Sequence, residues 1–208
     1  SADAYHHLVE SMRLAFADAF RYLADPAKVP VPTGELLSKE YAKTRRALID
    51  PKRAMASVPY GRVQDGGDTV YISSVDGEGN ACSFIYSIFA NFGTGMVVPG
   101  TGIVLHNRGS LFSLDPNHPN VLAPRKRPYH TIIPAMATLD GELYLCYGVM
   151  GGFMQPQGHL QVISNVVDFG MDPQATLNAL RFMVSQDSVS LEEGIPPEVV
   201  ADLEHRGH

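Results

Sequence analysis

The apolar residues near the start of the chain recur with the period of an α-helix. In residues 4–24 they stand four, four, four and three positions apart and form one apolar stripe: Leu8, Met12, Phe16, Phe20 and Leu23. Asp25-Pro26 should end this helix, because the residue before a proline disfavours helical backbone. A second helix is predicted over residues 33–50, with Thr33 as its N-cap.

From Thr69 onward the pattern changes to short strands separated by turn residues. The predicted strands are 69–75, 81–89, 102–107, 131–139, 142–149 and 188–191. Glycine-rich turns join the first two into one hairpin and the fourth and fifth into another. The predicted later helices are 155–170, with Leu160, Ile163, Val166 and Val167 facing inward, 172–182, with Asp172 as N-cap, and 196–206. Helices followed by hairpins and then by helices favour an α+β fold over regular βαβ alternation.

Composition limits the classes of partner. With 208 residues and 45% hydrophobic content, the chain is long enough for one substantial core. The net charge of −6 and a single short basic run, Arg125-Lys126-Arg127, argue against a nucleic-acid partner. We interpret this run as a solvated or site-lining turn. No apolar run approaches the roughly 18 residues that a membrane span needs, so no membrane segment is expected in this chain.

The compartment is left open by the sequence. Cys82 and Cys146 stand in apolar runs and are expected to be buried free thiols, and two cysteines do not fix the redox environment. The first residues lack a signal-peptide layout, which slightly favours the cytoplasm. However, the chain opens on Ser1 close to a helix and without an initiator Met, so we expect a piece of a longer protein whose targeting segment could lie upstream.

The residues around Thr69 raise the first chemical question. A β-branched residue at the head of a strand is ordinary, and Thr69 taken alone is best interpreted that way. However, Gly66-Gly67-Asp68 comes directly before it. Glycines allow unusual backbone angles, so they suit a peptide bond presented to attack by the side chain that follows it.

Five segments, in this order, resemble the gamma-glutamyltranspeptidase family of N-terminal-nucleophile hydrolases: "DTVYISSVDGEGNA", "FGTG", "PGTGIVLHN", "KRP" and "GVMGG". The resemblance runs from the first helix to about Arg181. It implies an αββα sandwich of which this chain is the C-terminal part only. It also implies a precursor that cuts itself between Asp68 and Thr69. Residues 1–68 would then end the large-subunit segment, and residues 69–208 would form the small-subunit-like catalytic segment.

The resemblance assigns catalytic roles that fit the chemistry of the residues. Thr69, once freed as a chain terminus, would use its own amine, with an ordinary pKa of about 7.7–8.0, as base for its hydroxyl. Such a site needs no cofactor and no histidine. Ser87 stands where the family usually has Thr and would orient that amine; otherwise it is strand filler. Gly151 and Gly152 would present N–H groups to the oxyanion, or simply make a strand-to-helix turn, and both interpretations can hold.

Departures from the family pattern concern the acyl pocket. Phe89 replaces an expected Asn, Leu111 stands where an Asp would pair with the substrate ammonium, and Arg108 replaces a neutral or acidic residue. Leaving an ammonium uncompensated costs roughly 3–5 kcal/mol, so a γ-glutamyl group should bind poorly. The expected substrate is an amide with a carboxylate and no ammonium, bound by a set of five residues: Asn107, Arg108, Tyr129, His130 and Thr131. Alternatively, Arg108 pairs with an acid such as Asp115.

The resulting hypothesis is an autoprocessing amidohydrolase or acyltransferase. Two alternatives remain: a true γ-glutamyl transferase or glutathione hydrolase, and an unprocessed, inactive homologue that acts as a binding subunit. A large-subunit portion absent from this chain, or another copy, is the expected protein partner. No metal is expected, because the acidic turn at residues 76–80 lacks the spacing and final Glu of a calcium loop.

Overall fold

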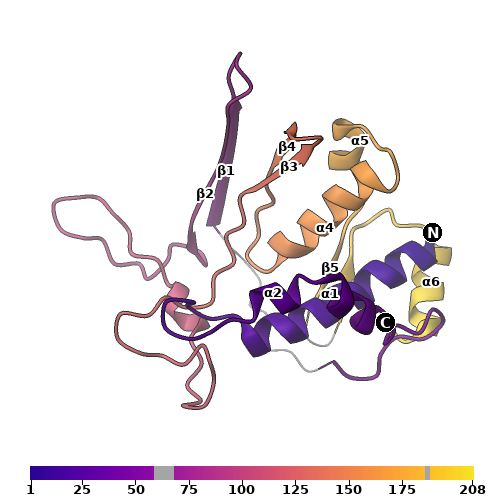
Figure 1. The fold of residues 1–208 in the computed structure, drawn as a ribbon, viewed down its shortest axis with the longest axis horizontal. Helices are drawn as coiled ribbons and strands as arrows, with labels where there is room; N and C mark the ends of the chain where they lie inside the picture. Colours follow the sequence, from indigo (N-terminus) through magenta and orange to yellow (C-terminus); the bar gives the residue numbers. More distant parts are fainter. Residues whose placement is uncertain (59–67, 186–187) are drawn as a thin grey trace. The chain divides into compact units, whose positions relative to one another are not determined.

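The computed structural model describes residues 1–58, 68–185 and 188–208, which group into two compact units. The first unit contains Ser1–Val63, Ser113–Arg127 and Leu160–His208, and the second contains Gln64–Phe112 and Pro128–His159. The helices are α1 (Ala2–Tyr22), α2 (Thr33–Leu36), α3 (Lys39–Arg46), the 3₁₀ helix η1 (Arg108–Leu111), α4 (Met154–Val167), α5 (Pro173–Asn178) and α6 (Pro197–Arg206) (Figure 1). The strands are β1 (Asp68–Val75), β2 (Ala81–Phe89), β3 (Ala135–Leu139), β4 (Glu142–Tyr147), β5 (Phe182–Val184) and β6 (Val189–Leu191). They pair as three antiparallel two-stranded sheets, β1–β2, β3–β4 and β5–β6.

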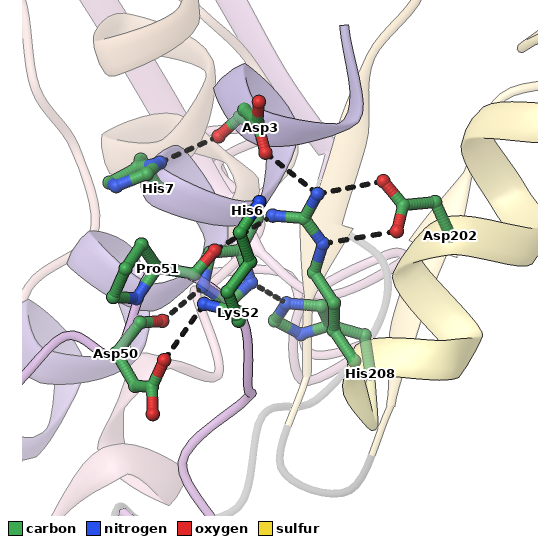
Figure 2. Close-up of polar contacts among 9 residues, drawn as sticks. Asp3, His6, His7, Asp50, Pro51, Lys52, Asp202 and His208 are labelled. Carbon is green, nitrogen blue, oxygen red and sulfur yellow. Dashed lines mark hydrogen bonds and ion pairs between the residues drawn. The ribbon is translucent and has the colours of Figure 1, made fainter.

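The first unit is built around α1, which packs against α6 and β5. Met12 and Phe16 of the predicted apolar stripe are buried, whereas Leu23 lies beyond the helix end and is exposed. A polar cluster ties the ends of α1 and α6 to residues 50–52 (Figure 2). In it, Arg206 donates to both Asp3 and Asp202 at 2.7 Å.

The predicted second helix is two helices. Ser38 is the N-cap of α3, and its side chain accepts a hydrogen bond from the Tyr41 N–H at 3.0 Å. The expectation that Thr33 is an N-cap is wrong, since Thr33 is the first residue of α2 and follows Pro32. A serine that caps a new helix interrupts an apolar pattern that looks continuous in the sequence.

The β1–β2 hairpin of the second unit agrees with the prediction. Alternation puts Thr69 and Ser87 on one face of it. On the opposite face, four large apolar side chains are exposed: Val70, Ile72, Phe84 and Tyr86. Cys82 is also exposed, so the expectation that both free thiols are buried is wrong.

Two other strand predictions needed correction. Residues 102–107 do not form a strand; Val97 and Val104 make one isolated bridge on either side of a turn in which Gly100 and Gly102 have positive φ. The strand predicted from residue 131 begins at Ala135, because Pro134 has no N–H to give to a ladder.

The later helices agree with the prediction more closely. Asp172 caps α5 by accepting from the Ala175 N–H at 2.8 Å, as expected. In α4, Val166 is buried but Val167 is exposed, which contradicts its predicted inward position. Strand β5 was not predicted. Among the described residues no helix is long and apolar enough to cross a membrane.

Candidate active site

Thr69 and Ser87 lie directly opposite each other at the irregular end of the β1–β2 ladder. Thr69 pairs with Ser87, whereas the preceding Asp68 pairs with Phe89, so the register shifts at the peptide predicted to be cut. Residues opposite each other in antiparallel strands have Cβ atoms about 4.5–5.5 Å apart. The Ser87 hydroxyl accepts from the Phe89 N–H at 2.9 Å and keeps its own proton to donate. It is therefore able to hydrogen bond a neighbouring amine.

The extra residue of this β-bulge, Ile88, anchors the segment that follows β2. The Asn107 N–H donates to the Ile88 carbonyl at 3.2 Å. The Asn107 side chain accepts from the Ala90 N–H at 2.9 Å, and donates to the carbonyls of Ala90 and Gly93 at 3.0 and 3.1 Å. Asn107 thus clamps the turn after β2, and this arrangement leaves only limited capacity to bind a substrate.

Arg108 follows Asn107 and is buried, with 3% of its surface exposed. Its Nη1 donates to the Thr131 hydroxyl at 2.7 Å, and its guanidinium carbon lies 4.9 Å from the centre of the Phe89 ring. Burial lowers the pKa of Arg108 from its ordinary value. It makes no ion pair with a described acidic side chain of the second unit, and the alternative pairing with Asp115, a residue of the first unit, remains a prediction.

Phe89 supports this arrangement with an uncommon backbone. Its φ is +79°, and its side chain is 1% exposed. A bulky residue at positive φ is a strained conformation, and such strain concentrates at functional sites.

The paired glycines come just before α4 and have positive φ, 110° at Gly151 and 59° at Gly152. Their carbonyls accept from Met154 and Gln155, whereas their own N–H groups donate to no main-chain carbonyl of the described residues. Free N–H groups at a helix N-terminus favour negative charge. Next to them, the Tyr129 ring stacks on Phe153 at 5.9 Å, and burial raises the pKa of the Tyr129 hydroxyl to about 12.

Contacts link several of these residues within the second unit. One series runs from Thr69 through Ser87 and Phe89 to Arg108 and Thr131. Separately, the Tyr129 ring stacks on Phe153, the residue that follows the glycine pair. Tyr71, two residues after Thr69 in β1, packs so tightly on Gly148 that a Cβ there would lie 2.3 Å from its ring. The first series therefore brings together residues from positions 69 to 131.

One predicted residue takes no part in these contacts, and one buried polar residue was not predicted. His130 is exposed, and its Nδ1 accepts from the Ile132 N–H at 3.2 Å. Gly66 and Gly67 lie outside the described residues. Gln155 was not predicted: it is fully buried, its Oε1 accepts from the Ile133 N–H at 2.9 Å, and its Nε2 has no partner among the described residues. The available signal was the run of polar residues at the start of a helix otherwise expected to be buried.

The whole chain is similar to several known proteins. The family model for gamma-glutamyltranspeptidase matches residues 1–208. The chain is 37% identical over its whole length to a glutathione hydrolase-like YwrD proenzyme of Bacillus subtilis, and 38% identical to an oxamate amidohydrolase proenzyme of Klebsiella pneumoniae. It spans about 40% of the length of each. A solved cephalosporin acylase from Bacillus halodurans is 45% identical, with a TM-score of 0.89 over the whole of this chain and 38% of that protein.

These likenesses agree with the fold class expected from the sequence. The solved structures similar to this chain are acylases and gamma-glutamyltranspeptidases, so the fold is of the N-terminal-nucleophile hydrolase type. Its helices and antiparallel hairpins fit the expected α+β class. The family match covers every residue, and the two curated relatives are aligned over the whole chain. The chain belongs to the gamma-glutamyltranspeptidase family.

Proposed function

We propose that the protein containing this chain is an autoprocessing amidohydrolase or acyltransferase whose nucleophile is Thr69. The observation that supports it is the position of Thr69, opposite a serine hydroxyl and at a β-bulge, in the same unit as Gly151-Gly152. Bulges are frequent next to active sites, where they redirect a side chain. The relatives named as proenzymes agree with a precursor that is cut.

Processing and turnover would use the same groups. In the precursor, the Thr69 hydroxyl attacks the Asp68 carbonyl, the peptide C–N bond breaks as an ester forms, and water hydrolyses the ester. This frees the Thr69 amine and the Asp68 carboxylate. In the mature protein, the amine takes the hydroxyl proton as Oγ attacks the acyl carbonyl, and the leaving amine departs with a proton. Water or an acceptor amine then releases the acyl group.

Two groups would support this chemistry. Ser87 would hold the Thr69 amine, and the free N–H groups of Gly151 and Gly152 would stabilise the oxyanion. Removing one oxyanion donor typically lowers kcat about 10²–10³-fold.

The acyl group of the substrate would differ from γ-glutamyl. Phe89 and Leu111 supply no side-chain acceptor where the family pattern has Asn and Asp, so a substrate ammonium would be left without a counter-ion. The resulting loss of roughly 3–5 kcal/mol is a hundredfold or more in affinity. The expected substrate is an amide whose acyl part carries a carboxylate. The named activities of two relatives, oxamate amidohydrolase and cephalosporin acylase, fit such a change of acyl group.

Processing is tested by gel mobility and N-terminal sequencing of the full-length protein. Wild type should give two fragments, the smaller beginning at Thr69. Thr69→Ala should stay as one uncut, inactive chain, whereas Thr138→Ala, an exposed threonine of β3, should be cut like wild type. An uncut wild-type chain with full amidase activity, or cleavage at another residue, would refute Thr69 as the nucleophile.

A further inference from the structure

Arg108 is a buried cation without an anion among the described side chains of its own unit. Its Nη2 is buried and has no hydrogen-bond partner among the described residues of that unit, and none of the described acidic side chains there, those of Asp76, Glu78, Asp140 and Glu142, forms an ion pair with it. Buried charges in proteins are paired almost without exception, because a charge removed from water and left alone is strongly unfavourable. The unpartnered Nη2 is therefore suited to binding a negative group.

The neighbours of Arg108 define the shape of that group. Phe89 covers one face of the guanidinium with its ring, which gives a cation–π contact but no hydrogen bond. Thr131 is 2% exposed and accepts from Nη1, so its own hydroxyl proton remains available to donate. The open Nη2–H and the Thr131 O–H thus offer two donors on neighbouring atoms. A planar group with two acceptor oxygens, a carboxylate, matches two such donors.

The location of Arg108 connects this group to the reaction. Phe89 is the cross-strand partner of Asp68 and follows Ser87 by two residues, and Ser87 is the partner of Thr69. The guanidinium therefore packs on the residue at the same end of the β1–β2 ladder as the nucleophile. A carboxylate held here would therefore lie at the end of the hairpin where Thr69 stands, as the acyl part of its substrate must.

We propose that Arg108, held in place by Thr131 and Phe89, binds the distal carboxylate of the acyl donor and selects monoamides of dicarboxylic acids. This inference rests on the proposed function and names the residue that sets its substrate class. An ammonium on the same acyl group would lie near the Arg108 cation. It would also have no counter-ion from Leu111, the last residue of the same 3₁₀ helix, because leucine has no carboxylate. Arg108 thus explains selection in both directions: it attracts the carboxylate and repels the ammonium.

Three p-nitroanilides separate these effects in the full-length protein. Glutaryl-p-nitroanilide carries the carboxylate alone, pentanoyl-p-nitroanilide lacks it, and γ-glutamyl-p-nitroanilide adds the ammonium. We expect kcat/KM for the glutaryl compound to exceed that of the other two about 100-fold. Arg108→Met should bring the glutaryl-to-pentanoyl ratio close to one, and Arg108→Lys should leave it intermediate, because lysine keeps the charge but not the planar fork. Thr131→Val, which removes the hydroxyl alone, should lower the ratio about tenfold.

Controls make the failures of the two proposals distinguishable. Arg46→Met, an exposed arginine of α3, should keep the wild-type ratio. Binding is also measured without turnover, as protection of processed protein against thermal unfolding by glutarate relative to pentanoate. A protein that is cut at Thr69 but hydrolyses glutaryl and pentanoyl compounds equally overturns the role of Arg108 and leaves the proposed function intact. An uncut protein overturns the proposed function first.

A structural role for Arg108 has its own signature. If Arg108 pairs with an acid elsewhere in the full-length protein, Arg108→Met and Arg108→Lys should lower thermal stability and reduce turnover of both substrates by the same factor. Glutarate and pentanoate would then protect wild type equally. Either result overturns the inference.

Discussion

The strained main chain at Phe89 should reverse the usual order of stability between a glycine and an alanine substitution in a strand. At +79°, φ at this position lies in the left-handed region, which costs an L-residue about 1–2 kcal/mol and glycine almost nothing. In an ordinary strand the order is opposite, since glycine is about 0.5–1 kcal/mol less stable than alanine. We therefore expect Phe89→Gly to be more stable than Phe89→Ala.

The magnitude follows from burial and backbone together. Phe89 is 1% exposed, so either truncation should lower the free energy of unfolding by about 3–5 kcal/mol. Relief of the left-handed strain should leave the glycine variant about 1 kcal/mol above the alanine variant. For 150–250 residues that difference is about 2–4 °C in Tm.

Ile85 provides the matched control on the same strand. It is half-buried, and its φ is not positive. Ile85→Ala should therefore be more stable than Ile85→Gly. The assay is equilibrium urea unfolding, in which an altered midpoint at an unchanged m-value reports stability. If alanine exceeds glycine at both positions, the main chain at residue 89 is not left-handed in solution and the strain argument fails.

Two further predictions concern a clamp and a buried histidine. Asn107→Ala removes three side-chain hydrogen bonds to Ala90 and Gly93, at about 1 kcal/mol each. Limited proteolysis near residues 90–95 should therefore accelerate at least tenfold. A raised KM without faster proteolysis would show that Asn107 binds the substrate instead. Burial, chiefly, lowers the pKa of His208 to about 4. Between pH 6.5 and 4, His208 of the unfolded chain, with a pKa near 6.5, binds a proton that His208 of the folded protein does not. Stability should therefore fall as pH drops from 6.5 to 4, by at most about 1.4 kcal/mol per pH unit. In His208→Gln the midpoint of urea unfolding should change less with pH across that range. If the midpoints of wild type and variant change with pH by the same amount, the lowered pKa of His208 is contradicted.

The arrangement within the second unit decides which candidate residues act together. Arg108 and Thr131 are 23 positions apart, and their hydrogen bond depends on Asn107 docking onto the β-bulge at Ile88. Neither contact has a local sequence signal. The predicted division at residues 68 and 69 concerns a cleavage point and remains a prediction.

Local chemistry let the sequence determine a good part of this protein by itself. Alternating residues around a glycine-rich turn specify the β1–β2 hairpin and put Thr69 and Ser87 on one face, and the order of motifs identifies the family. The N-cap at Asp172 is likewise a property of a few adjacent residues. These features depend on steric preferences and periodicity that act over a few positions.

The tertiary structure alone decided the environment of each side chain. Asn107 is predicted from the sequence to bind substrate, which remains a prediction, and only the fold shows that its amide also holds the turn brought against it. Arg108 had two sequence interpretations, and only packing shows that it is buried on Phe89 and Thr131, away from the described acidic side chains of its own unit. The physical reason is that burial and partnering are made by segments distant along the chain. A residue type states which bonds it can make, and the fold determines which partners are within reach.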